Sequence, residues 1–226
     1  MAWEIAFPEA WSAKQREIAE RTLANFERLI ADAKLLVAHG RFKSAFSLSV
    51  LALEEVGKVA LSLWDNPEEL RAYDRKWTFH RKKQTAATML LQAEHGVLEA
   101  IRLLKTRDPN AELPQPQEGR AIREALAEAI ASSKASRLAF YVALGATERV
   151  KHLGFYFDED SYDLGLTGDD LTREAVMESI MEAEQSASLL SNRMVIAAAR
   201  NLYLLSEIPK PPPDWRRRPE DRPDAG

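Results

Sequence analysis

Apolar residues recur mostly every three or four positions along several long stretches of this chain, and this spacing constrains the fold more than any other feature. One such stretch has its apolar positions at Ile18, Leu23, Phe26, Ile30, Ala33 and Val37. Residues at this spacing line one face of an α-helix, whereas a half-buried strand needs strict alternation. Helix-forming residues dominate, and only 9 of the 226 residues are glycine. The sequence therefore predicts an all-α fold.

Proline, glycine and capping residues indicate where the helices begin and end. Pro8 suits the first turn of a helix, Gly40 suits a stop, and the stretch from Thr167 to Asp170 suits an N-terminal cap. We expect about five long helices, at residues 8–38, 42–64, 77–105, 119–152 and 170–205. Long amphipathic helices with short connections favour an antiparallel helical bundle.

The composition changes near the C-terminus. Residues 1–208 carry the helical pattern, and we expect them to form a single bundle domain. Residues 209–226, PKPPPDWRRRPEDRPDAG, are rich in proline and arginine, which is typical of a disordered tail. The run WRRR in this tail lies among acidic residues, which favours a solvated segment over a nucleic-acid-binding arm.

Composition also excludes several classes of protein. The chain has no cysteine, which excludes disulfides, thiolate zinc sites and cysteine nucleophiles. The first 21 residues lack the pattern of a signal peptide, and no apolar run is long enough for a membrane span, so we expect a cytoplasmic protein. The net charge is −4, so any nucleic-acid site must be a local one.

The stretch SVLALEEVGKVALSLW, residues 49–64, places three charges and a glycine in the middle of an apolar helix. Glu54 and Glu55 are each within one turn of Lys58, so one interpretation is an intrahelical ion pair on an exposed edge. The other is a polar pocket between helices. Gly57 fits this second interpretation, because glycine in a helix interior permits close approach of another backbone or a ligand. Both interpretations stay open on the sequence.

Two further stretches concentrate basic and aromatic residues. RKWTFHRKKQ, residues 75–84, contains His80, and we expect the surrounding cations to make a local anion site in an acidic chain: Arg75, Arg81, Lys82 and Lys83. ERVKHLGFYFDED, residues 148–160, supplies Arg149, Lys151, His152, Tyr156 and Asp158. Both stretches also have a purely structural interpretation. His80 would then be a structural histidine, and the second stretch would be a basic helix end followed by packed aromatic residues.

The segments AFSLSVLALEEVGK, WTFHRKK and KHLGFYFDED, in this order, resemble the AbiV-type abortive-infection family of the HEPN superfamily. The resemblance extends over about residues 20–200 and implies a HEPN-like helical bundle. It also implies a metal-independent endoribonuclease that acts on RNA as a homodimer in phage defence, with no cofactor. HEPN ribonucleases carry an arginine followed, after four to six residues, by a histidine, which Arg75 and His80 match.

The resemblance gives each candidate residue a role. His80 is the expected acid–base group, and Arg75 the cation that stabilises charge on phosphorus. Substrate-binding or supporting roles are expected for Glu54, Glu55, Lys58, Lys83, Arg149, Lys151, His152, Tyr156 and Asp158.

Two other functions compete with RNA cleavage. One is a non-catalytic HEPN module that binds a nucleotide, or a phage or host protein that acts as a trigger. The other is a di-metal helical bundle, which needs Glu-x-x-His pairs on two helices. Three residues before the four histidines stand Leu36, Trp77, Gln92 and Arg149, so the sequence speaks against this metal site.

Overall fold

The computed structural model describes residues 5, 7–64, 77–106, 116–132, 138–139, 141–142, 147, 151 and 171–205. The elements within these ranges are all helical, which confirms the all-α class. They are α1 (Ala13–Ala38), α2 (Phe42–Trp64), α4 (Trp77–Thr106), α5 (Pro116–Ser132), α8 (Arg173–Ser188), the 3-10 turn η3 (Leu189–Ser191) and α9 (Arg193–Leu205).

The first three helices lie close to their expected positions, with one difference at the start of α1. Pro8 precedes the helix instead of opening it, because Ser12 is the N-cap. The Ser12 side chain accepts a hydrogen bond from the Gln15 N–H, and the Gln15 side chain accepts one from the Ser12 N–H in return. This reciprocal capping box fixes the start of α1 at Ala13.

The last expected helix, 170–205, is broken into α8, η3 and α9. Its N-cap is Thr172, whereas the cap expected at 167–170 lies outside the described residues. The break occurs where the Asn192 side chain accepts hydrogen bonds from the N–H groups of Met194 and Val195 and so starts a new helix. Of the expected helix 119–152, α5 covers the first part, and the described residues beyond it are helical.

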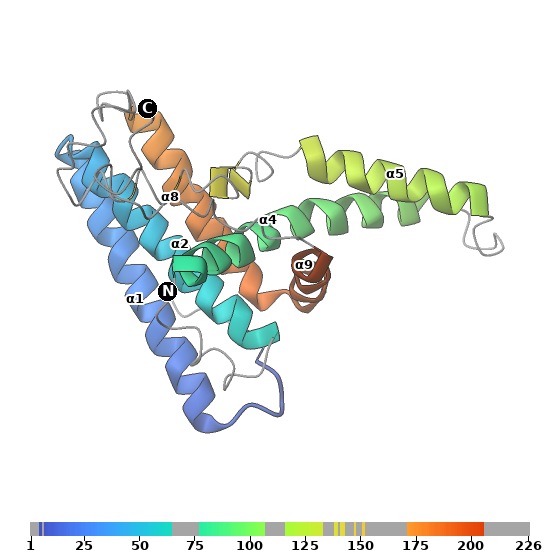
Figure 1. Ribbon diagram of the computed structural model, residues 1–226, viewed down its shortest axis with the longest axis horizontal. Helices are drawn as coiled ribbons and strands as arrows, with labels where there is room; N and C mark the ends of the chain where they lie inside the picture. Colours follow the sequence, from blue (N-terminus) through green and yellow to red (C-terminus); the bar gives the residue numbers. More distant parts are fainter. Residues whose placement is uncertain are drawn as a thin grey trace, which may run out of the picture.

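Helices α1, α2 and α8 lie side by side, with α2 in contact with both of the others (Figure 1). Helix α4 crosses α2, contacts α9, and then continues beside α5 away from this layer (Figure 1). The side chains of Phe26, Val56, Leu90, Ile180 and Leu190, from α1, α2, α4, α8 and η3, are each at most 1% exposed. A single apolar core therefore holds the helical layers together.

The backbones of α2 and α4 come into direct contact at Gly57. A Cβ atom at this position would lie 1.7 Å from the carbonyl oxygen of Lys83 and 2.4 Å from its carbonyl carbon. Only glycine permits such an approach between two backbones. Ala60 on α2 and Ala86 and Ala87 on α4 are fully buried nearby in sequence, so small residues surround the crossing. This close approach explains the glycine in the middle of a buried helix.

We predict that Gly57→Ala lowers the free energy of unfolding by about 3 kcal/mol or more, because the added methyl group meets a backbone carbonyl that cannot move aside without displacing α4. Urea denaturation followed by circular dichroism measures this change. Gly96→Ala on α4 is the matched control. Its added Cβ meets only the end of the Ile130 side chain, at 3.1 Å, so we expect a change within about 1 kcal/mol of the wild type. Equal stability of the two variants would contradict the proposed crossing.

Candidate functional site

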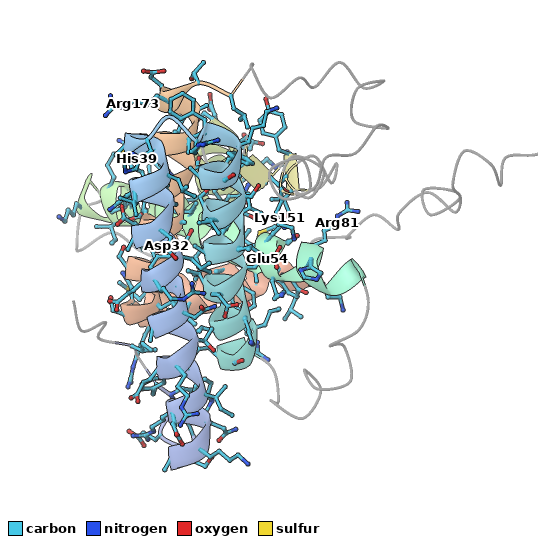
Figure 2. All side chains as sticks on the ribbon, turned by 90° about the vertical axis from the view of Figure 1, so that its left-hand side faces the viewer. Asp32, His39, Glu54, Arg81, Lys151 and Arg173 are labelled. Carbon is cyan, nitrogen blue, oxygen red and sulfur yellow. The ribbon has the colours of Figure 1, made fainter. Side chains whose placement is uncertain are left out.

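Glu54 is a buried acid in the centre of α2, with 2% of its surface exposed. It precedes Gly57 by three residues, so both residues face the same side of the helix. Because Gly57 brings the α4 backbone against α2, the Glu54 side chain meets the first turns of α4. Figure 2 shows Glu54 and Lys151 close together beside the start of α4.

Four side chains contact the two carboxylate oxygens of Glu54. His80 Nδ1 lies 2.6 Å and Lys83 Nζ 3.2 Å from Oε2. Gln84 Nε2 and Lys151 Nζ each donate to Oε1 at 2.9 Å. A further residue joins through Gln84, whose Oε1 accepts a hydrogen bond of 2.6 Å from the Thr147 hydroxyl. We call these six residues the Glu54 cluster: Glu54, His80, Lys83, Gln84, Thr147 and Lys151.

The geometry of α4 explains why three of these groups converge. His80, Lys83 and Gln84 are three and four residues apart, which places them on one face of a helix. The segment that contains Lys151 is held to α2 a second time, since the Ser47 hydroxyl donates to the Lys151 carbonyl at 2.8 Å. The cluster therefore links α2, α4 and residues 147 and 151 through one carboxylate.

The charge state of Glu54 follows from these contacts. Burial by itself raises the pKa of Glu54, because it disfavours the charged form. The hydrogen bond from His80 and the charges of Lys151 and Lys83 outweigh burial, and together they lower the pKa to about 2. Glu54 is therefore ionised at neutral pH, and its oxygens only accept hydrogen bonds.

His80 connects this buried carboxylate to solvent. Its side chain is 44% exposed, whereas those of Lys83 and Lys151 are 11% and 7% exposed. Because an ionised carboxylate only accepts, Nδ1 of His80 carries the proton in the hydrogen bond to Glu54. Nε2 of the neutral ring is then an acceptor, and it makes no hydrogen bond to any residue in the described ranges. A carboxylate that fixes the tautomer of an exposed imidazole is a known arrangement for acid–base chemistry.

The cluster also has an excess of positive charge. Counted over its six residues alone, the two lysines and the single carboxylate carry formal charges that sum to +1. Arg81, which follows His80, is buried as well, and burial lowers the pKa of its guanidinium below the ordinary value. Positive charge in a partly desolvated position attracts anions more strongly than the same charge on an open surface.

The other expected site residues have different positions. Glu55 and Lys58 are half-buried on α2, and within the described part of the chain neither Glu54 nor Glu55 pairs with Lys58. The intrahelical ion pair considered for this stretch is thus replaced, for Glu54, by bonds to other helices. A further five candidates lie outside the described residues: Arg75, Arg149, His152, Tyr156 and Asp158.

Two members of the cluster were not among the expected site residues. Gln84 follows His80 by one helical turn, so its position on the same face was visible in the sequence. Thr147 is 63 positions away from the Gln84 that it contacts, and no local pattern indicates this pairing. Across the described ranges, no three histidine, aspartate or glutamate side chains are grouped as a metal site would require.

Comparison with known protein families identifies the chain. The family model of AbiV HEPN domains matches residues 14–188. The chain belongs to the AbiV family. The match begins next to the first residue of α1, ends at the last residue of α8, and includes every member of the Glu54 cluster. Searches among curated proteins and among solved structures gave no match for this AbiV-family chain.

The fold of this AbiV-family chain agrees with that of HEPN domains, which are helical bundles. None of the helices in the described ranges has both the length and the apolar character that a membrane span requires.

We predict that Glu54→Gln lowers the free energy of unfolding at pH 7 by about 3 kcal/mol, because Lys83 and Lys151 then remain buried beside a neutral group. The pKa of Glu54 is about 2 in the folded protein, against an ordinary value of 4.5 for a glutamate. Its ionised form therefore stabilises the fold above about pH 4.5, and this contribution is lost as the pH falls towards 2. The stability difference between wild type and variant should shrink over that range.

Urea titrations of both proteins between pH 7 and pH 2.5 measure this difference. Glu55→Gln is the matched control, since Glu55 is the next residue on α2 and is half-buried without an ion pair to the described residues. We expect it to change stability by about 0.5 kcal/mol or less at every pH. A Glu54→Gln variant that behaves like Glu55→Gln would show that the cluster does not hold the helices together.

Proposed function

We propose that this AbiV-family protein is a metal-independent endoribonuclease of a phage-defence system, with His80 as its acid–base group. The observation that carries this proposal is the hydrogen bond between the buried, ionised Glu54 and the exposed His80. A surface histidine alone is most often structural. A histidine whose tautomer is fixed by a buried carboxylate, beside two buried lysines, has the parts that cleavage of RNA requires.

RNA cleavage without a metal uses the 2′-hydroxyl of the substrate as the nucleophile. Nε2 of His80 accepts the proton of this hydroxyl while its oxygen attacks the adjacent phosphorus. The bond from phosphorus to the 5′-oxygen breaks, that oxygen takes up a proton from a solvent water molecule, and a cyclic phosphate and a 5′-hydroxyl are formed. The imidazolium that forms at His80 is stabilised by the negative charge of Glu54.

Two sets of cations support the charge on the phosphate in this proposal. Lys83 and Lys151 give the cluster its net positive charge and draw a phosphate towards His80. Arg75 has the arginine position of the HEPN pattern, and it remains the proposed partner of His80 by resemblance. Arg149 and His152 keep their proposed substrate-binding or supporting roles. Glu55, the residue after Glu54, and Lys58, one turn further along α2, are proposed to contact or orient the substrate.

We predict that His80→Ala lowers the rate of RNA cleavage by about 100- to 10,000-fold, the range expected for loss of an acid–base group. The fold should persist, since Lys83, Gln84 and Lys151 still hold Glu54. His95→Ala is the matched control: His95 lies fifteen residues further along α4, about 22 Å away, and its loss should leave the rate unchanged.

The assay follows degradation of a fluorescent RNA by purified protein, with and without a chelator. Wild-type activity should be the same in both conditions. Equal rates for wild type and His80→Ala would remove His80 from the mechanism. A wild-type protein that binds RNA or a partner without cleaving RNA would favour the alternative function, a non-catalytic HEPN module.

A homodimer is part of the same proposal, because HEPN ribonucleases bring two arginine–histidine sets to one cleft. We predict that light scattering at micromolar concentration gives twice the chain mass of 25.5 kDa. Mixing wild type with a His80→Ala chain in excess should then lower activity below the value expected from dilution. A monomer that is fully active would contradict the shared cleft.

A further inference from the structure

A concave site lies at the C-terminal end of α2. It has a volume of about 460 Å³, which is within the usual range for small-molecule sites. Its walls come from the segment before α1, the last residues of α2 and one face of α9. The lining residues are Phe7, Pro8, Glu9, Leu63, Trp64, Arg193, Ile196, Ala197 and Arg200. We call this site the α9 groove.

The apolar part of the α9 groove is held in place by its own contacts. The indole N–H of Trp64 donates to the Ile196 carbonyl at 3.1 Å, and the Trp64 ring packs against Tyr203 with centroids 5.3 Å apart. In the segment before α1, the ring of Phe7, which lines the groove, lies 5.5 Å from that of Trp11. A flat ring that enters the groove therefore meets aromatic and aliphatic surface that is already positioned.

Two arginines give the groove its charge. Arg193 and Arg200 are seven residues apart on α9, which places them on one face, about 10 Å apart along the axis. Both are exposed, and neither makes a hydrogen bond or ion pair to another residue of the described ranges. Between them lie Ile196 and the small, exposed Ala197. Since Glu9 is the single acid in the lining, the groove has a net charge of +1.

The α9 groove is distinct from the Glu54 cluster. Trp64 follows Glu54 by ten residues, which corresponds to about 15 Å along α2. The two sites share no residue. A ligand in the groove therefore does not occupy the position of an RNA phosphate near His80.

We propose that the α9 groove binds a small organic anion with a flat apolar body. The ring of this ligand lies over Trp64 and Ile196, and its acid group lies between Arg193 and Arg200. To contact the acid group at the midpoint, each arginine side chain has to extend about 5 Å along the helix axis. Planar guanidinium groups pair with carboxylate, sulfonate and phosphate oxygens through two parallel hydrogen bonds. The recognised chemistry is an aryl or otherwise apolar body that carries one such acid group.

The probe for this proposal is 8-anilinonaphthalene-1-sulfonate, which combines two aromatic groups with one anion and fluoresces when bound. We expect one molecule to bind per chain. The double variant Arg193→Gln/Arg200→Gln should bind at least about tenfold more weakly, since hydrogen bonds between charged groups are lost. The double variant Arg16→Gln/Arg173→Gln removes the same charge from exposed arginines outside the groove, and its affinity should stay within twofold of the wild type.

Two further measurements separate the parts of the groove. N-phenyl-1-naphthylamine lacks the sulfonate, so its binding should be weak and insensitive to the arginine variants. Ala197→Trp fills the groove from an exposed position and should abolish binding of both probes. The proposal is overturned if the two double variants weaken sulfonate binding equally, or if wild type shows no saturable site. Competition by benzoate or by phenyl phosphate then tells a carboxylate ligand from a phosphate ligand.

Discussion

A single buried carboxylate organises the centre of this protein. Glu54 carries a full negative charge inside a helical core, and an isolated charge there would be strongly unfavourable. It is stable because two lysines, an imidazole and an amide donate to its two oxygens. These donors come from α4 and from residue 151, so the need to solvate one charge fixes three segments of the chain. Gly57 makes this arrangement possible, since a Cβ atom at this position would overlap the Lys83 carbonyl of α4.

The sequence predicts the helices well and the site only in part. The period of the apolar residues is a local property, and α2 begins and ends at the expected positions for this reason. Helix capping is also local, but several neighbouring side chains can compete to form the hydrogen bonds that start a helix. Ser12 rather than Pro8 starts α1, and Asn192 interrupts a pattern that otherwise continues to residue 205.

The partners of Glu54 could not be predicted from spacing on one helix. The sequence offers Lys58 at four residues, but a buried carboxylate takes its partners from the helices that exclude it from water. Gly57, three residues after Glu54, is the informative residue in the sequence. It indicates that another part of the chain approaches α2 closely, but it does not indicate which part. Thr147 has no comparable signal in the sequence. It joins the Glu54 cluster only through its hydrogen bond to Gln84, and no property of its neighbours in sequence indicates a contact with α4.

The break between α8 and α9 has a consequence for how the protein is divided. The match to the AbiV family ends at residue 188, and α9 begins at Arg193. The Glu54 cluster lies wholly within the matched part, whereas the α9 groove takes one wall from α2 and its two arginines from beyond the match. Substitutions on the outer face of α9 therefore alter what the groove recognises without disturbing the buried carboxylate. The buried face of α9, with Val195 and Ala199, belongs to the common apolar core, whereas its exposed face carries the two arginines of the groove.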